Sequence, residues 1–206
     1  IESICITPSV IDLTENCFNG ANSLKKVTVM PNNKRYLSID DKFIVGKSKI
    51  ENKNFDVFIF ACRDVKTVTF PKTIKIIEQH ALSSCNKLKT VKFPFDSELE
   101  IIKKESFQRS SISEISFPAH LKIICEKAFS GCSNLVKVEF ASNCELQKIE
   151  LRAFLNTGIK SISIPQNLTT ICKESFKNCE MLQRVVIPKN SKLSNIEKYV
   201  FSDSKI

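Results

Sequence analysis

Apolar and polar residues alternate along this chain in a pattern that repeats about every 23 residues. From Val65 onward the step between units alternates between 23 and 24 residues. Within a unit, apolar residues follow at the third and fifth places after the first, and then come a Leu, an Ile and a small residue followed by Phe or Leu. Such self-similarity is typical of stacked repeat arrays. Eight units are recognised, and they begin at Ile1, Leu24, Val65, Leu88, Ile112, Leu135, Ile159 and Leu182.

The first part of each unit has the period of a β-strand. Val68, Thr69 and Phe70 alternate apolar and polar side chains, which favours an extended segment with one buried face. All seven prolines stand at the end of such segments, at what we take to be one repeat position, and only Ala141 takes the place of a proline. Proline has no N–H to donate to a ladder, so it is expected to end each strand.

The second part of each unit predicts a short helical return. Between Ile124 and Cys132 the apolar residues fall at places i, i+4, i+5 and i+8, which suits one helical or 3₁₀ turn. No unit can bury its apolar side alone, so the units must stack. The expected fold class is an α/β repeat, a right-handed solenoid over residues 1–206 with a parallel sheet on its concave face and short helical or 3₁₀ turns on its convex side. Ile1 and Ile206 both open a unit, so the array is expected to continue in a longer protein, and exposed ends are expected to associate end to end.

One segment breaks the array. The step from Leu24 to Val65 is 41 residues, about 18 more than one unit, and residues 32–64 replace the second part of unit two. Residues 43–45 and 57–60 are strand-like apolar runs, separated by a lysine-rich polar stretch at 46–54. These features predict a β-hairpin that protrudes from the solenoid. Two interpretations stay open: a dedicated binding element, or a decoration that caps and stiffens the array.

The pattern LxxVxFPxxLxxIxxxAF resembles the leucine-rich repeats of BspA-like surface proteins, and the likeness covers essentially the whole chain. Like that family, the chain lacks the asparagine ladder of ordinary leucine-rich repeats. The resemblance implies a curved solenoid on a cell surface that serves adhesion or binds host proteins. It also extends to the insert, where the family carries a Tyr-x-Ser-Ile-Asp motif before a short hairpin. Tyr36, Ser38, Ile39 and Asp40 match this motif, and Asp41 stands where the family has glycine.

The charge of the chain bears on its partners. Lys and Arg number 31 and Asp and Glu 22, a formal net charge of +9. This balance favours acidic ligands such as anionic glycans or acidic proteins, although solvated surface lysines are the simpler explanation. No run of five basic residues occurs and few aromatic residues lie among the lysines, which argues against specific nucleic-acid binding. No apolar run approaches the roughly 18 residues of a membrane span, so membrane anchoring is expected only through flanking sequence.

The nine cysteines are an odd number, so at least one thiol has no partner within the chain. Cys85, Cys132 and Cys179 are spaced by 47 residues, or two units. Equivalent positions two units apart lie about 10 Å from one another, too far for a disulfide. They are therefore interpreted as small buried apolar residues. Bridges between Cys125 and Cys132, or between Cys62 and Cys85, remain alternatives.

Little in the sequence points to catalysis. Neither histidine, His80 nor His120, lies in a known nucleophile or metal pattern, and His80 is expected on the outer side. Only four glycines occur and no phosphate-binding motif is present. No catalytic residue, cofactor or metal is therefore expected. Cys144 lies in a turn where exposure is one alternative, and Asn167 belongs to the one N-glycosylation sequon, which makes it a candidate for modification in a secreted protein.

The candidate site is the outer face of the predicted sheet. Side chains between the apolar strand positions point to solvent, and the inner curved sheet is the usual binding face of a solenoid. These positions are rich in Ser and Thr and poor in aromatic residues, so weak or multivalent contacts are expected. The candidate binding face consists of Lys26, Thr28, Thr67, Thr69, Thr90, Lys92, Glu114, Ser116, Lys137, Glu139, Ser161, Ser163 and Arg184.

The sequence thus predicts a non-enzymatic binding module, with cell-surface adhesion or the binding of host proteins or glycans as its function. The alternative is an intracellular scaffold for protein interactions, and the odd cysteine count and the single sequon fit this alternative. A surface or secreted location follows from the resemblance, and a cytoplasmic location from the alternative.

Overall fold

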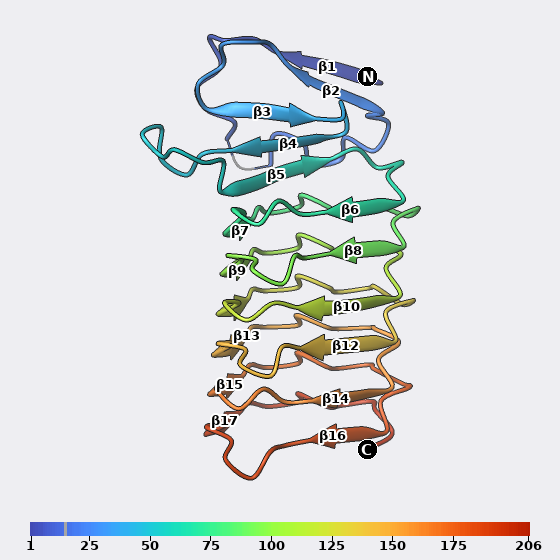
Figure 1. Ribbon diagram of the computed structural model, residues 1–206. Coiled ribbons are helices and arrows are strands. Elements are labelled where there is room, and N and C mark those ends of the chain that lie inside the picture. The colour runs from blue at the N-terminus through green and yellow to red at the C-terminus, as the bar shows by residue number, and fades with distance from the viewer. Residues whose placement is uncertain (15) are drawn as a thin grey trace.

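The computed structural model describes residues 1–14 and 16–206 and shows a β-solenoid of about eight turns (Figure 1). From the third unit on, each turn of the solenoid has three sides. The first is an opening strand, the second is a strand of two residues, and the third is a run of tight turns. We call these sides the opening-strand layer, the nine-stranded sheet and the turn column.

The opening-strand layer contains the segments that alternate in sequence. Its strands pair in parallel and in phase, so that Ile115 lies beside Val138 and Ile162 beside Val185, with these apolar side chains turned inward. Three hydrogen-bonded sheets make up the layer: β1 (Ser3–Ile6) with β2 (Lys26–Val29), β6 (Thr67–Thr69) with β8 (Thr90–Lys92), and β10 (Glu114–Phe117) with β12 (Lys137–Phe140), β14 (Ser161–Ser163) and β16 (Arg184–Val186).

The prolines do not all share one repeat position, as the sequence had suggested. Pro8 and Pro31 lie one residue further from the start of their opening strands than the other five prolines do. In unit two the additional residue before the proline is Met30. Its N–H donates to the carbonyl of Ile6 at 2.8 Å and so extends the pairing of units one and two. Ala141 likewise donates to Phe117 at 3.0 Å, a bond that proline could not make.

The nine-stranded sheet forms the second side. Its repeat strands carry an Ile that is fully buried in most units, as at Ile77, Ile102 and Ile124. These strands are parallel and comprise β7 (Ile76–Ile77), β9 (Ile101–Ile102), β11 (Ile123–Ile124), β13 (Lys148–Ile149), β15 (Thr170–Ile171) and β17 (Asn195–Ile196).

The prediction of helical or 3₁₀ turns on the third side is wrong, since residues 1–14 and 16–206 contain no helix. The N–H of Leu82 donates to Ser106 at 2.7 Å, and the N–H of Phe107 donates to Ala128 at 2.8 Å. These bonds join neighbouring units and use donors that a helix would need for itself. Left-handed residues recur as well and interrupt any helix. They fall in two rows, His80, Glu105, Lys127, Arg152, Glu174 and Tyr199 in one, and Ser84, Arg109, Gly131, Asn156, Asn178 and Asp203 in the other.

A stack of phenylalanine rings lies inside the turn column. The ring centroids of Phe107, Phe129, Phe154, Phe176 and Phe201 follow one another at 4.9, 5.1, 5.1 and 5.7 Å. The planes are tilted by at most 19°, so the rings stack in parallel. Aromatic pairs at this spacing stabilise a core beyond the area that they bury. The stack therefore holds successive units in register in the turn column.

The insert is a three-stranded antiparallel meander, not the protruding two-stranded hairpin that the sequence predicted. It consists of β3 (Tyr36–Ile39), β4 (Phe43–Gly46) and β5 (Val57–Ala61), with a bulge between Ile44 and Val45. β5 pairs in parallel with β7, so the meander completes the nine-stranded sheet. Pairing β5 with the solenoid buries its apolar run on both faces, and a free hairpin would have exposed it. Only the loop between β4 and β5 projects (Figure 1).

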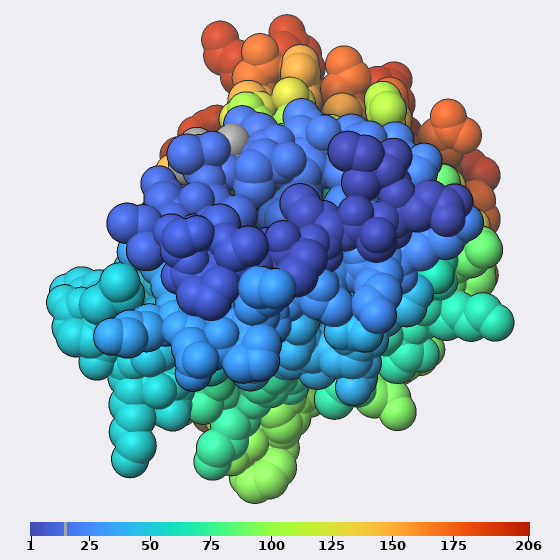
Figure 2. Space-filling model, turned by 90° about the horizontal axis from the view of Figure 1, so that it is seen from above, coloured from blue at the N-terminus to red at the C-terminus, as the bar shows by residue number. Residues whose placement is uncertain are grey.

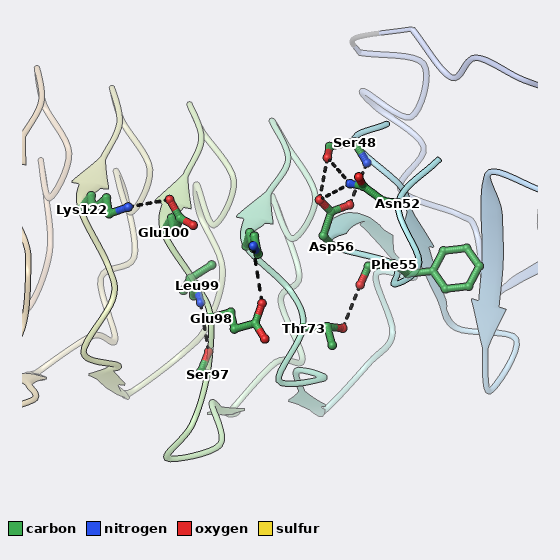
Figure 3. Close-up of polar contacts among 11 residues, drawn as sticks. Ser48, Asn52, Phe55, Asp56, Thr73, Ser97, Glu98, Leu99, Glu100 and Lys122 are labelled. Atoms are coloured by element: carbon green, nitrogen blue, oxygen red, sulfur yellow. Dashed lines mark hydrogen bonds and ion pairs between the residues drawn. The ribbon is translucent and has the colours of Figure 1, made fainter. Parts of the chain in front are cut away.

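That loop is held by one buried carboxylate. Asp56 is 7% exposed and accepts the backbone N–H of Ser48 at 2.7 Å, the Ser48 hydroxyl at 2.6 Å and the Asn52 amide at 2.9 Å (Figure 3). The hydroxyl of Thr73 donates to the carbonyl of Phe55 at 2.9 Å and fixes the end of the loop to unit three. Bonds to a charged acceptor are among the stronger ones in proteins, so this loop keeps a defined shape.

Arg63 joins the meander to the repeats. In later units, carbonyls of the turn column accept N–H groups from the unit before, but the insert replaces this part of unit two. The Arg63 guanidinium supplies donors instead, to Ala81 at 3.0 Å and to His80 at 3.1 Å, and it lies over the Phe60 ring at 4.6 Å. Seen along the axis, the first residues of the chain lie across this end of the stack (Figure 2), and Phe18 stacks on Phe60 at 4.5 Å.

Removal of either of two buried serine hydroxyls should stabilise the folded protein. Ser106 and Ser175 occupy the small position before the stacked phenylalanines, where other units have alanine or valine, and both hydroxyls are buried without a hydrogen-bond partner among the described residues. Ser106→Ala and Ser175→Ala should each raise the free energy of unfolding by about 1 kcal/mol, because an unsatisfied buried hydroxyl is lost. The reverse change at the equivalent position, Ala153→Ser, should lower it by a similar amount. Urea denaturation measures both, and a loss of stability in the two alanine variants would contradict the prediction.

The turn between β3 and β4 allows a test of backbone strain at Asp41. The N–H of Lys42 donates to Ile39 at 3.0 Å, and the two central residues, Asp40 and Asp41, both have φ of 53°, as in a type I′ turn. Asp41→Gly removes the cost of a side chain in the left-handed region, whereas Asp41→Ala keeps it. Both variants lose the exposed ion pair with Lys26, which contributes little. The glycine variant should therefore be about 1 kcal/mol more stable than the alanine variant in thermal unfolding, and equal stability of the two would refute this account.

Candidate binding face

The structure places the thirteen candidate residues on the outer side of the opening-strand layer, as expected from the alternation. Most are exposed, whereas Thr28 and Thr90 are half-buried. From β10 to β16 the columns are continuous, because Glu114 lies beside Lys137, Lys137 beside Ser161 and Ser161 beside Arg184. This part of the predicted face is therefore one surface.

The insert separates the part of the face that lies on β2 from the part that lies on the later strands. Lys26 and Thr28 lie on β2, which pairs with β1 and has no bridge to β6. Instead, the N–H of Val27 donates to Asp41 at 2.8 Å, and the N–H of Val29 donates to the Ser38 hydroxyl at 3.0 Å. The structure therefore does not bring Lys26 and Thr28 together with the other candidate residues in one continuous ladder.

The charges on the face are partly neutralised. Glu139 contacts Lys137 at 2.9 Å and accepts a hydrogen bond from Ser116 at 3.1 Å. The bond from Lys137 lowers the pKa of the Glu139 carboxyl, and the same bond raises the pKa of Lys137. Lys92, Arg184 and Glu114 have no ion pair within the described part of the chain. The face has four basic residues against two acidic ones, so it carries an excess of positive charge.

A groove of about 860 Å³ adjoins the face where the opening strands end. Its floor contains Phe117 and Ile164, which are 2% and 3% exposed, and its rim contains amide side chains such as Asn143 and Gln166. The groove arises because the segment between proline and leucine alternates in length. It is longer after Pro94 than after Pro118, and this alternation recurs every 47 residues. Longer loops therefore stand on either side of shorter ones.

Phe95 is the functional candidate that the sequence reasoning missed. It lines the groove and is 98% exposed, and the equivalent residues two and four units later are Ser142 and Lys189. An aromatic side chain directly after a repeat proline, outside the apolar pattern, was the signal that could have found it. Exposed aromatic residues beside an apolar groove are the type of residue that dominates the energetics of binding surfaces.

Two residues of these loops differ from expectation. Cys144 was considered for exposure but is 2% exposed, because the longer loop folds its thiol towards the carbonyl of Pro118 at 3.6 Å. Asn167 is half-buried and donates its amide to the carbonyl of Cys144 at 3.0 Å. Glycosylation of Asn167 stays a prediction, and it would require this inter-unit hydrogen bond to break.

The histidines occupy different environments. His80 was expected on the outer side, but its side chain is only 11% exposed and lies 3.5 Å from Glu105. Burial lowers the pKa of His80, although Glu105 opposes this effect. His120 is exposed and contacts Glu145 at 3.1 Å. In the described residues, no three His, Cys, Asp or Glu side chains are grouped to hold a metal ion, and no helix is long and apolar enough to cross a membrane.

The repeat cysteines are buried, as predicted. Cys85, Cys132 and Cys179 are fully inaccessible, and the Cys132 thiol donates to the carbonyl of Phe107 at 3.0 Å. All nine cysteines are free, so neither Cys125–Cys132 nor Cys62–Cys85 is bridged. Burial raises the pKa of the Cys62, Cys125 and Cys132 thiols to about 11.

Thiol reactivity tests this arrangement. Cys5 and Cys17 are the exposed cysteines, so they should react with a thiol reagent in the native protein. The six buried cysteines should react only after unfolding, because their thiolates are inaccessible and are suppressed by the raised pKa. The half-buried Cys125, whose pKa is also raised, should react slowly. A colorimetric thiol assay with and without denaturant counts these classes. More than two rapidly reacting thiols in the native protein would show that the core opens.

Comparisons with known proteins agree with this geometry. The chain matches the family described as BspA type leucine rich repeat region over residues 1–99, 48–145 and 100–206, in six copies. No curated protein matches it significantly. A solved leucine-rich repeat protein from Eubacterium ventriosum superimposes with a TM-score of 0.74 at 23% identity, over 100% of this chain and 59% of that one.

Two further solved structures are similar. The pneumococcal vaccine antigen PcpA has a TM-score of 0.61 at 23% identity, over 76% of this chain and 39% of PcpA. A leucine-rich cell surface protein from Faecalibacterium prausnitzii has a TM-score of 0.56 at 25% identity, over 96% of this chain and 48% of that one. The chain thus spans between 39% and 59% of these three proteins.

The repeat match, the parallel strand layers and the phenylalanine stack all indicate a stacked leucine-rich repeat array. The fold is that of protein-interaction modules, which are generally non-enzymatic. With its whole length matched, the chain belongs to the BspA-type leucine-rich repeat family.

Proposed function

We propose that this chain is a non-enzymatic binding module of a cell-surface protein, and that it holds a protein or glycan ligand on the opening-strand layer and in the adjoining groove. The observation that carries the proposal is Phe95, an aromatic side chain that is 98% exposed at the edge of an apolar groove of about 860 Å³. Such a side chain gains more than most from being covered by a ligand.

The opening-strand layer and its groove favour a ligand that makes many small contacts. The strand positions carry Ser and Thr hydroxyls at regular intervals, and the groove rim adds amides such as Asn143 and Gln166. Units repeat at the strand spacing of about 4.8 Å, so a chain-like ligand can meet equivalent groups along the layer. Lys92 and Arg184, which have no ion pair among the described residues, favour acidic groups on that ligand.

The surface location rests on the family and on two similar structures, one described as a cell surface protein and one as a vaccine antigen. An intracellular scaffold is the second candidate, and the nine free thiols favour it, since reducing compartments keep cysteines unpaired. Both candidates use the same face, so mapping the binding surface tests what they share.

Binding measurements with two aromatic variants test the face. The protein should be screened against immobilised extracellular-matrix proteins and acidic glycans by biolayer interferometry. Phe95→Ala should weaken binding of the ligand found by about tenfold or more, and higher salt should weaken it further. Phe95 is 98% exposed, so its removal should leave the melting temperature unchanged.

Tyr199→Ala provides the matched control. Tyr199 is a 61% exposed aromatic residue in the turn column, on another side of the solenoid. Its removal should leave binding unchanged. Binding that survives Phe95→Ala but fails in Tyr199→Ala would place the ligand on the turn column and overturn the proposal.

A further inference from the structure

The accessible apolar surface of the groove recurs at every second unit. The residue before the proline is almost fully buried in units with a short loop, as at Phe117 and Ile164, which are 2% and 3% exposed. In units with a long loop the equivalent residues, Phe93 and Phe140, are half-buried and line the groove. Two units span about 10 Å at the strand spacing. A ligand that lies along the solenoid axis therefore meets accessible phenylalanine surface about every 10 Å.

We call Phe93 and Phe140 the two apolar stations of the groove. The core fixes both of them, since the Phe93 ring stacks on Phe70 with centroids 4.8 Å apart and the Phe140 ring stacks on Phe117 at 5.2 Å. The loop that follows each station along the axis is a short one, and the groove lies over these short loops. Both stations therefore keep their positions before any ligand arrives, which lowers the entropic cost of binding.

The spacing of the stations selects among the conformations of a peptide ligand. In a polyproline II helix three residues make one turn and rise about 9.3 Å, so residues i and i+3 lie on the same face. In a β-strand, residues on one face are about 6.6 or about 13 Å apart, and neither spacing matches the stations. An α-helix returns a side chain to the same face after seven residues, or about 10.5 Å, but its carbonyls are bonded within the helix.

The rim of the groove favours a ligand backbone with free carbonyls. Asn143, Gln166 and Asn190 line the groove with exposed side chains, and each amide can donate two hydrogen bonds. A polyproline II backbone has no internal hydrogen bonds, so its carbonyls can accept them, whereas those of an α-helix cannot. Phe95, which lies two residues after the first station, adds an exposed ring. Aromatic surfaces of this kind are where proline-rich segments dock.

The two ends of the groove are basic. Lys92 belongs to unit four and Lys189 to unit eight, and neither forms an ion pair among the described residues. The nearby carboxylates of Asp96 and Glu139 are already paired with lysines, at 3.2 and 2.9 Å. Four units span about 19 Å along the axis, which is the rise of about six residues of polyproline II. Acidic residues about six positions apart therefore complement this charge distribution.

We propose that the groove binds an extended proline-rich segment of a protein partner in the polyproline II conformation. Prolines at positions i and i+3 of this segment cover the stations Phe93 and Phe140, and flanking acidic residues face Lys92 and Lys189. The inference rests on the proposed function, and it narrows the ligand of the groove from a protein or glycan to one kind of peptide. A glycan in the same groove is the competing outcome of the test.

Nuclear magnetic resonance titration with two synthetic peptides of identical composition tests the spacing. EAPAAPE has its prolines three residues apart, whereas EPAAAPE has them four apart and keeps the same length and the same acidic ends. EAPAAPE should give saturable shifts at Phe95, Ala119 and Asn143, and it should bind at least about fivefold more tightly than EPAAAPE. QAPAAPQ, without the acidic ends, should bind more weakly than EAPAAPE at low salt. Equal binding of the first two peptides, or no saturable shift up to about 10 mM, would overturn the proposal.

Two substitutions in the short loop of unit five locate the peptide. Ala119 is half-buried and lines the groove, so Ala119→Leu fills space beside the first station and should weaken EAPAAPE binding by about tenfold or more. His120→Leu is the matched control at the next position, which is exposed and outside the groove lining, and it should leave binding unchanged. Phe95→Ala gives the readout if Ala119→Leu does not fold. Unchanged binding of EAPAAPE to the folded variant would refute the assignment.

The failure of this inference can be told apart from the failure of the proposed function. If neither proline peptide binds but a glycan or another protein surface does so in a way that depends on Phe95, the inference is wrong and the proposed function stands. If binding of no ligand depends on Phe95, both are wrong.

Discussion

Hydrogen bonds between successive units are the interaction on which this structure depends. They occur on all three sides of the solenoid, in the opening-strand layer, in the nine-stranded sheet and in the turn column. Each turn of chain satisfies its neighbour's backbone, so no side needs a helix to satisfy its own. The apolar rows inside then come into register, and the phenylalanine rings stack at about the spacing that the strands impose.

The same constraint explains the insert. A solenoid that changes its chain path must still provide donors for the carbonyls of the next unit. β5 does so for β7, and the N–H of Ala61 together with the Arg63 guanidinium does so for Ala81. A charged side chain buried over the Phe60 ring thus replaces part of a backbone ladder. The insert therefore belongs to the hydrogen-bonded framework.

Much of this arrangement could be predicted from the sequence, because period and alternation are local properties of the chain. The opening strands, the buried cysteines such as Cys132 and the outward columns follow from the spacing of apolar residues alone. The third side could not be predicted in this way. The spacing from Ile124 to Cys132 is compatible with a helix, and only the inter-unit bonds decide against it. Phe95 was missed because it lies outside the repeat pattern, where the period carries no information.

The alternation of loop length has a consequence for how such an array grows. Long and short loops follow one another after successive prolines, and the cysteines keep the same 47-residue phase. The true structural repeat of the array is therefore a pair of units. Duplication or deletion of one pair of units moves the downstream surface by about 10 Å along the axis. It also keeps the order in which long and short loops alternate. Loss of a unit with a short loop would place two long loops side by side and close the groove, and loss of a unit with a long loop would remove one wall of the groove. Only even steps therefore preserve this surface.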